Sequence, residues 1–156
     1  MYELNHENRD EWRKEVIRNL FADHFHYVIE ALVKVTHVSK LILWENVAVY
    51  LFWLYETVLK DKDQESIAES DFRFLFKEAE GFLFWFFYNN PLTKFDHPKS
   101  FIEEIKDSVR VRKTCCFSYK LAGSNKRCKT CPCRAISNES GCLSEQAVCN
   151  VIHDYN

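Results

Sequence analysis

Four cysteines near the C-terminal end of the chain have the residue type and spacing of a metal-binding site. Cys115 and Cys116 are adjacent, and after eleven intervening residues Cys128 and Cys131 form a C-x-x-C motif. The turn in a C-x-x-C motif directs two thiolates at one metal ion, so this motif predicts two ligands. The adjacent pair can supply two more only where the backbone turns, because neighbouring side chains of an extended strand point to opposite faces.

The spacing alone leaves the identity of the metal open. Zinc takes four ligands around one ion, whereas a [2Fe-2S] cluster takes two thiolates on each of its two irons. Free or disulfide-bonded thiols are the third alternative. Seven cysteines in a chain whose N-terminus lacks an apolar export signal predict a reducing, cytoplasmic location, where metal or redox chemistry is commoner than disulfide bonds.

The segment that carries these cysteines is basic, although the chain as a whole is slightly acidic. Residues 110–134 contain eight Lys or Arg and no Asp or Glu, which leaves 21 − 8 = 13 basic and 23 acidic residues elsewhere. Positive charge near an anionic cluster favours its reduced form and attracts anionic partners. A solvated basic loop is the alternative. The residues expected to dock a substrate or an electron donor flank the cysteines: Arg112, Lys113, Lys126, Arg127 and Lys129.

The rest of the chain predicts a mainly α-helical fold. The 156 residues include only 3 Gly and 3 Pro, which is few for an all-β protein rich in tight turns. Apolar residues at spacings of three to four predict helices over residues 8–38, 40–60 and 71–88. Residues 60–71 are charged and predict a solvated loop or a frayed helix end, with Ser70 as the cap of the third helix and Asn89-Asn90-Pro91 as its end.

A shorter helix is expected directly before the cysteines. Ser100 and Glu103 have the spacing of a capping box, which predicts a helix that starts there and ends before Arg112. Gly123-Ser124-Asn125 predicts a turn between the two cysteine pairs. We therefore expect a helical bundle at residues 1–110, an irregular cysteine-rich cluster-binding segment at 111–134 and a tail at 135–156. No stretch of 18 uncharged apolar residues exists, so we expect no membrane span, although peripheral association stays open.

The motif TCCFSYKLAGSNKRCKTCPC resembles the C-terminal motif of the ferric-siderophore reductase (FhuF-like) family. That motif is an adjacent cysteine pair, a tract with aromatic residues and a turn, and then C-x-x-C followed by proline. Leu43, Trp44 and Asn46 are similar to the family's Leu-Trp-x-Asn helix, and YNNPL at residues 88–92 is similar to its Asn-Pro-Leu segment. The resemblance covers about residues 21–132, with an inter-pair loop of eleven residues where the family usually has ten.

The resemblance implies a [2Fe-2S] cluster with Cys115, Cys116, Cys128 and Cys131 as ligands. It also implies the one-electron reduction of a ferric siderophore, with electrons from a donor such as a ferredoxin or a flavin reductase. The chain is similar to the C-terminal half of longer family members, so a second copy or a partner is expected to replace the other half. No acid–base residues are needed for electron transfer, and no nucleic acid is expected as a partner.

The histidines, the aromatic residues and the remaining cysteines have simpler interpretations than a role in the metal site. His24, His26 and His37 are expected to be structural or solvated, and the aromatic residues between 72 and 88 are expected to pack in the core. Cys133 is close enough in sequence to replace Cys131 as a ligand, whereas Cys142 and Cys149 are expected to be plain thiols or, less favoured, part of a second site with His153. Two other functions compete with the reductase: a zinc-stapled interaction or nucleic-acid-binding module, and a cluster-based redox or iron sensor.

Overall fold

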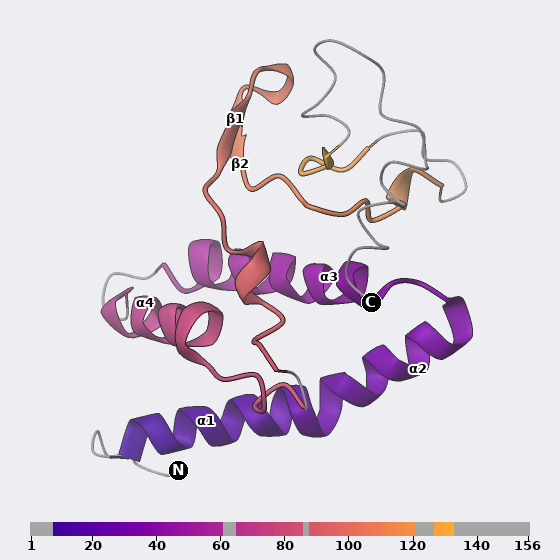
Figure 1. The fold of residues 1–156 in the computed structure, drawn as a ribbon. Helices are drawn as coiled ribbons and strands as arrows, with labels where there is room; N and C mark the ends of the chain where they lie inside the picture. Colours follow the sequence, from indigo (N-terminus) through magenta and orange to yellow (C-terminus); the bar gives the residue numbers. More distant parts are fainter. Residues whose placement is uncertain (1–7, 61–64, 86–87, 121–126, 133–156) are drawn as a thin grey trace.

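The computed structural model describes residues 8–60, 65–85, 88–120 and 127–132, and it is mainly helical (Figure 1). Its first element is one long bent helix. Helix α1 (Arg9–Leu20) passes through a π-helical turn at Phe21–Phe25 into helix α2 (His26–Thr36), which confirms the helix predicted over residues 8–38. One extra residue in the π turn rotates the apolar face between α1 and α2.

The two faces of this long helix differ in burial. Ile17, Phe21 and Ile29 point into the core and are at most 7% exposed. By contrast, Trp12 and Val16 of the same periodic apolar pattern are each about two-fifths exposed, at 41% and 40%. The long helix therefore has an outer apolar face as well as an inner one.

Helix α3 (Lys40–Trp53) extends through a second π turn at Leu54–Val58, as the prediction for residues 40–60 required. Its start is well defined, because the Ser39 hydroxyl accepts a hydrogen bond from the amide N–H of Leu41 at 3.2 Å. The preceding helix ends at His37, which adopts the left-handed conformation with φ 56°. In the view of Figure 1, α3 lies between the long helix on one side and the hairpin and cysteine segments on the other.

The third predicted helix is shifted towards the N-terminus. Helix α4 (Glu65–Arg73) runs into a π turn at Phe74–Glu78, so Ser70 lies inside the helix and is not its cap. The charged residues from Glu65 onward are helical because they share an amphipathic pattern with Ile67 and Phe74. The helix also ends ten residues earlier than predicted, at Glu78, well before the Asn-Pro pair.

The Asn-Pro-Leu segment instead holds the chain that returns across α4. The Asn90 side chain donates to the carbonyl of Leu75 at 2.7 Å, and its carbonyl accepts from the amide N–H of Leu92 at 2.8 Å. The hydroxyl of Thr93 donates to the carbonyl of Phe76 at 2.8 Å. Both carbonyls belong to the π turn Phe74–Glu78. The last carbonyls of a helix have no hydrogen-bond donor within the helix, so the returning segment supplies one.

The helix predicted from Ser100 and Glu103 is wrong, because these residues form a β-hairpin. Strand β1 (Ser100–Ile102) pairs antiparallel with strand β2 (Asp107–Val109), with Ser100 opposite Val109. A 3₁₀ turn at Glu103–Ile105 and the left-handed Lys106, φ 50°, close the connection. Phe101 and Ile102 favour a strand, and the partner strand outweighs a local capping signal.

The core contains many aromatic side chains, although Phe82 and Tyr88, which were expected to pack there, are 56% and 98% exposed. Phe76 and Phe84 are fully buried, and the ring of Phe84 packs against those of Phe21 and Trp44 at centroid distances of 5.0 and 6.1 Å. Phe76 stacks on Phe52 at 4.6 Å. Tilted and edge-to-face arrangements of this kind add to the hydrophobic gain from burial. None of the described helices is long and apolar enough to cross a membrane.

Candidate metal centre

Two segments that lie twelve or more residues apart bring the four cysteines together. One is the strand-like stretch after β2, which contains Cys115 and Cys116, and the other is the turn that contains Cys128 and Cys131. The amide N–H of Arg112 donates to the carbonyl of Thr130 at 2.9 Å, which joins the two segments. The amide N–H of Cys131 donates to the carbonyl of Cys128 at 3.1 Å, so the C-x-x-C motif forms the predicted turn. All four thiols are free.

Cys116 and Cys128, one from each segment, have their sulfurs 3.6 Å apart. Two thiolates on one tetrahedral metal ion lie about 3.8 Å apart, given metal–sulfur bonds of about 2.3 Å. Cys115 and Cys131 are both buried, at 4% and 3% exposure, while Cys116 and Cys128 are half-buried. Across the described ranges, no group of three or more His, Cys, Asp or Glu side chains is already arranged to hold a metal ion, so the sulfurs must adjust when they bind one.

A left-handed residue turns the backbone just after the adjacent pair. Phe117 has φ 56°, and its amide N–H donates to the sulfur of Cys115 at 3.4 Å. The amide N–H of Lys120 donates to the carbonyl of Phe117 at 2.9 Å within a short 3₁₀ turn, Ser118–Lys120. This turn follows Cys116, whereas the prediction placed the turn between Cys115 and Cys116.

The local environment shifts the pKa values of Cys115, Cys116 and Cys128 in different directions. Burial raises the pKa of Cys115, and burial followed by the contact with Cys116 raises the pKa of Cys128 to about 11. Burial also acts on Cys116, but hydrogen bonding to Ser118, then to Cys128, and the charge of Arg112 lower its pKa. Of Cys115, Cys116 and Cys128, Cys116 is thus the thiol most ready to ionise, and metal binding at Cys115 and Cys128 must displace protons.

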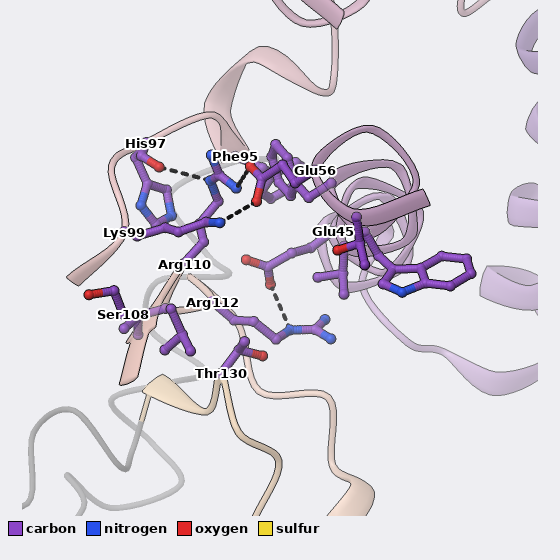
Figure 2. A pocket seen from close by; sticks show the side chains of 15 residues that line it. Glu45, Glu56, Phe95, His97, Lys99, Ser108, Arg110, Arg112 and Thr130 are labelled. Atoms are coloured by element: carbon purple, nitrogen blue, oxygen red, sulfur yellow. Dashed lines mark hydrogen bonds and ion pairs between the residues drawn. The ribbon is translucent and has the colours of Figure 1, made fainter. Parts of the chain in front are cut away.

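A buried carboxylate on α3 holds the residues immediately before the cysteines. Glu45 is only 3% exposed and accepts hydrogen bonds from the amide N–H groups of Lys113 at 2.6 Å and Thr114 at 2.9 Å. The Thr114 hydroxyl donates to the same carboxylate in a short contact. Nε of Arg112 lies 3.4 Å from it (Figure 2). Glu45 therefore fixes three consecutive residues, 112 to 114, against the helix.

A second carboxylate, Glu56 in the π turn that follows α3, holds the base of the hairpin. Glu56 pairs with Arg110 and with Lys99, each at 2.6 Å, and the Arg110 guanidinium lies 3.8 Å from the ring centroid of Phe52. Glu45 and Glu56 line the same cavity. Burial acts first on Glu56, but Lys99 and Arg110 outweigh it and lower its pKa. A cavity of 320 Å³ lies between these two contacts (Figure 2).

Neither carboxylate was among the predicted site residues. Glu45 stands between Trp44 and Asn46 in the motif quoted above, but no role was predicted for it. A charged residue in the middle of a helix that is apolar on nearly every side was the available signal, because such a charge is buried only when it is paired.

The structure places the predicted docking residues in different surroundings. The side chain of Arg112 is 6% exposed and lies inside the protein against Glu45, so it is not a surface docking residue. Lys113 and Lys129 are exposed, and Lys129 pairs with Asp107 of the hairpin at 2.6 Å. Arg127 is half-buried, with its guanidinium 4.5 Å from the Tyr119 ring centroid and 3.8 Å from the sulfur of Cys131.

Some predictions fall outside the residues that the structure describes. These are the roles of Lys126, Cys133, Cys142, Cys149 and His153 and the turn at residues 123–125. The histidines behave as expected: His24 and His37 are exposed, and the buried His26 stacks on Trp85 with ring centroids 4.4 Å apart.

Comparison with known protein families gives two matches. Residues 4–97 match the family model described as ferric iron reductase FhuF-like transporter, and residues 112–132 match the model described as FhuF 2Fe-2S C-terminal domain. The first match alone covers more than half of the chain. No curated protein and no solved structure matches this chain. The second match implies that the cofactor is a [2Fe-2S] cluster.

The described residues suit such a cluster. Four free thiols from two segments supply the required donor set. Nη2 of Arg112 is buried and has no hydrogen-bond partner among the described residues, and its charge acts on Cys116. A buried guanidinium N–H without an acceptor is costly, and an anionic cluster beside it would supply that acceptor. The described residues thus include four thiols of the right type and a buried hydrogen-bond donor near Cys116.

Proposed function

Because this chain belongs to the FhuF-like ferric iron reductase family, we propose that it reduces the Fe(III) of a ferric siderophore to Fe(II) in the cytosol. The observation that carries the proposal is the set of four free thiols, Cys115, Cys116, Cys128 and Cys131, within the matched 2Fe-2S domain. We assign these four as the cluster ligands. The zinc-stapled module is disfavoured, because the domain match implies iron and sulfide rather than zinc.

The chemistry of the substrate explains why one electron is enough. Siderophores bind Fe(III) through hard oxygen donors, and these ligands hold the softer, less charged Fe(II) far more weakly. When bound, a [2Fe-2S] cluster supplies single electrons at a potential set by its surroundings. The reaction needs no proton transfer from the protein, and the proposal assigns no acid–base residue.

The residues of the chain have three tasks in this proposal. The thiolates hold the cofactor, and burial of Cys115 and Cys131 keeps water away from one side of it. Arg112 places a buried positive charge beside Cys116, which favours the more negative, reduced form. Glu45 keeps Arg112 and the two following residues in place, and therefore acts as a positioning residue.

The exposed cations remain candidates for docking an acidic electron donor such as a ferredoxin or a flavin reductase. Lys113 and Lys129 are exposed beside the cysteines, which supports that role. A second copy or a partner protein stays a prediction, and the outer apolar face of α1 and α2 is the described surface where either would be sought.

The test begins with anaerobic purification. We expect about two irons and two sulfides per chain, with charge-transfer absorption that bleaches on reduction. The reduced protein should then convert a ferric hydroxamate or carboxylate chelate to Fe(II), trapped by a coloured Fe(II) chelator. A colourless protein with about one zinc would overturn the proposal, as would a loaded protein that reduces none of these chelates.

A further inference from the structure

A large groove opens beside the cysteine segment. It has a volume of 1720 Å³ and runs along the start of α3, the turn after α4 and the Asn-Pro-Leu segment. Pockets for drug-sized ligands usually measure about 300–1,000 Å³, so this groove can admit a bulky chelate. Most of its lining belongs to the part of the chain matched by the first family model, and Phe117 belongs to the matched 2Fe-2S domain.

Phe117 links the groove directly to the proposed cluster ligands. Its side chain lines the groove, while its amide N–H donates to the sulfur of Cys115 at 3.4 Å. It is also the residue next to Cys116 in the chain. A molecule in the groove would therefore lie against the residue that contacts the metal centre, a suitable position for an electron acceptor.

The groove carries an excess of positive charge. Lys40, Lys77 and Lys94 line it, against a single lining carboxylate, Glu80. The positive end of the α3 helix dipole adds to this potential, because Ser39 and Lys40 at the helix start are part of the lining. Lys40 pairs with Glu30 at 2.5 Å and Lys77 pairs with Asp96 at 3.5 Å, and both of these carboxylates lie outside the lining.

A further cation stands near the cysteine end of the groove. Desolvation, and then repulsion from Lys113, lower the pKa of Lys94. Lys113 immediately precedes the buried Thr114 and the cysteine pair, and its backbone is fixed by Glu45. Two lysines that repel each other are stabilised when an anion lies between or beside them.

Apolar side chains complete the lining. Phe82 and Tyr88 are 56% and 98% exposed, and the side chains of Ile42 and Trp44 lie deeper, at 5% and 2%. Aromatic and aliphatic surfaces with a few charged groups are typical of ligand pockets. They suit the organic backbone of a chelator, while the lysines suit its charge.

We propose that this groove binds the substrate, and that Lys40, Lys77 and Lys94 select a ferric chelate of net negative charge over a neutral one. This inference rests on the proposed function for the identity of the metal, and it adds the place of binding and the charge class. Phe117 forms the wall between the bound chelate and the cysteines.

The test separates binding from reduction by the use of gallium(III), which resembles Fe(III) in charge and size but does not accept an electron here. Isothermal titration calorimetry of the cluster-loaded protein would compare a trianionic gallium(III) tris-catecholate with a neutral gallium(III) tris-hydroxamate. We expect the anionic complex to bind about tenfold more tightly. Replacement of Lys40, Lys77 and Lys94 by Gln should weaken its binding by about tenfold, since each exposed charge pair contributes about 1.5- to 5-fold.

The matched control replaces three lysines outside the groove, Lys14, Lys34 and Lys106, by Gln. It has the same net charge as the groove variant and should bind like the wild type, and unchanged circular dichroism and cluster absorption verify that both variants are intact. Equal binding of the two gallium complexes, or equal losses in the groove and control variants, would overturn the groove proposal.

Reduction assays show which proposal fails. If ferric chelates are reduced with the same KM by the wild type and the groove variant, the groove proposal is wrong and the proposed function stands. If the gallium complex binds in a lysine-dependent manner but no ferric chelate is reduced, the groove proposal stands and the proposed function is wrong.

Discussion

Replacement of Glu45 by Gln tests whether one buried carboxylate attaches the cysteine segment to the helical layer. The wild-type carboxylate accepts from the backbone of Lys113 and Thr114 and from the Thr114 hydroxyl, and it balances the charge of Arg112. Glutamine has nearly the same shape, but its NH₂ group is a donor and would face other donors. The substitution therefore removes the negative charge and leaves some of these hydrogen-bond donors without an acceptor.

The expected cost follows from burial. Glu45 and the Arg112 side chain are 3% and 6% exposed, so water does not replace the lost contacts. Breaking a buried ion pair by removal of one partner costs about 3–5 kcal/mol, and this range already includes the unsatisfied donors. At about 1.4 kcal/mol per factor of ten, the opening equilibrium of the segment shifts by about 100- to 3000-fold.

Amide hydrogen exchange measures this effect at the residues concerned. In Glu45→Gln, the amides of Lys113 and Thr114 should exchange about 100- to 3000-fold faster than in the wild type, up to the limit set by unprotected exchange. Amides in the middle of α1 should change far less. Glu69→Gln is the matched control, because it removes the same charge from an exposed position on α4.

The loaded protein provides a second measurement. Loss of the Glu45 contacts frees Arg112 from its position beside Cys116, so the reduction potential and the rate of cluster loss to a chelator should both change. If Glu45→Gln keeps wild-type protection at Lys113 and Thr114 together with a wild-type potential, then the carboxylate does not hold the segment and our reasoning is refuted.

Three more predictions concern the site and its support. Cys116→Ser should bleach or shift the absorption of the cluster and abolish ferric-chelate reduction while the helical circular dichroism persists; an unaltered spectrum would remove Cys116 from the ligand set. Neutralising Lys126, Arg127 and Lys129 together should lower the reduction potential and weaken the salt dependence of reduction, because nearby positive charge favours the more negative, reduced cluster; voltammetry that shows no change would favour a solvated loop. Glu56→Gln should lose most stability near neutral pH and little in acid, because a carboxylate with a lowered pKa stabilises the fold above its unfolded-state pKa and loses this contribution as the pH falls through its folded-state pKa. Urea unfolding of both proteins at each pH checks this prediction, and a pH-independent difference between them would contradict it.

The elements that could be predicted were those determined by local pattern. The long N-terminal helix and α3 follow from apolar periodicity that continues over many turns, and the C-x-x-C turn follows from its own short sequence. The family resemblance also required only the order and spacing of residues, and the two family matches confirm it.

The errors occurred where a local signal competed with a distant partner. Ser100 and Glu103 match a capping box, but pairing of Ser100 with Val109 gives a strand. Ser70 matches a cap, but the pattern of α4 begins earlier and places it inside the helix. A capping interaction contributes about 1 kcal/mol, which cross-strand pairing and burial together readily exceed.

The sequence by itself determined the donor set, four cysteines within a basic segment, because ligand chemistry depends on residue type and short spacing. Tertiary structure decided how that segment is held. Only the folded chain places Glu45 within hydrogen-bonding distance of residues 113 and 114, separated from it by more than sixty positions, and moves Arg112 from an expected surface role into the interior. It also brings Phe117 to the end of a groove formed by α3 and the Asn-Pro-Leu segment. Contacts of this kind arise because buried charges must find partners wherever the packing of the helices places them.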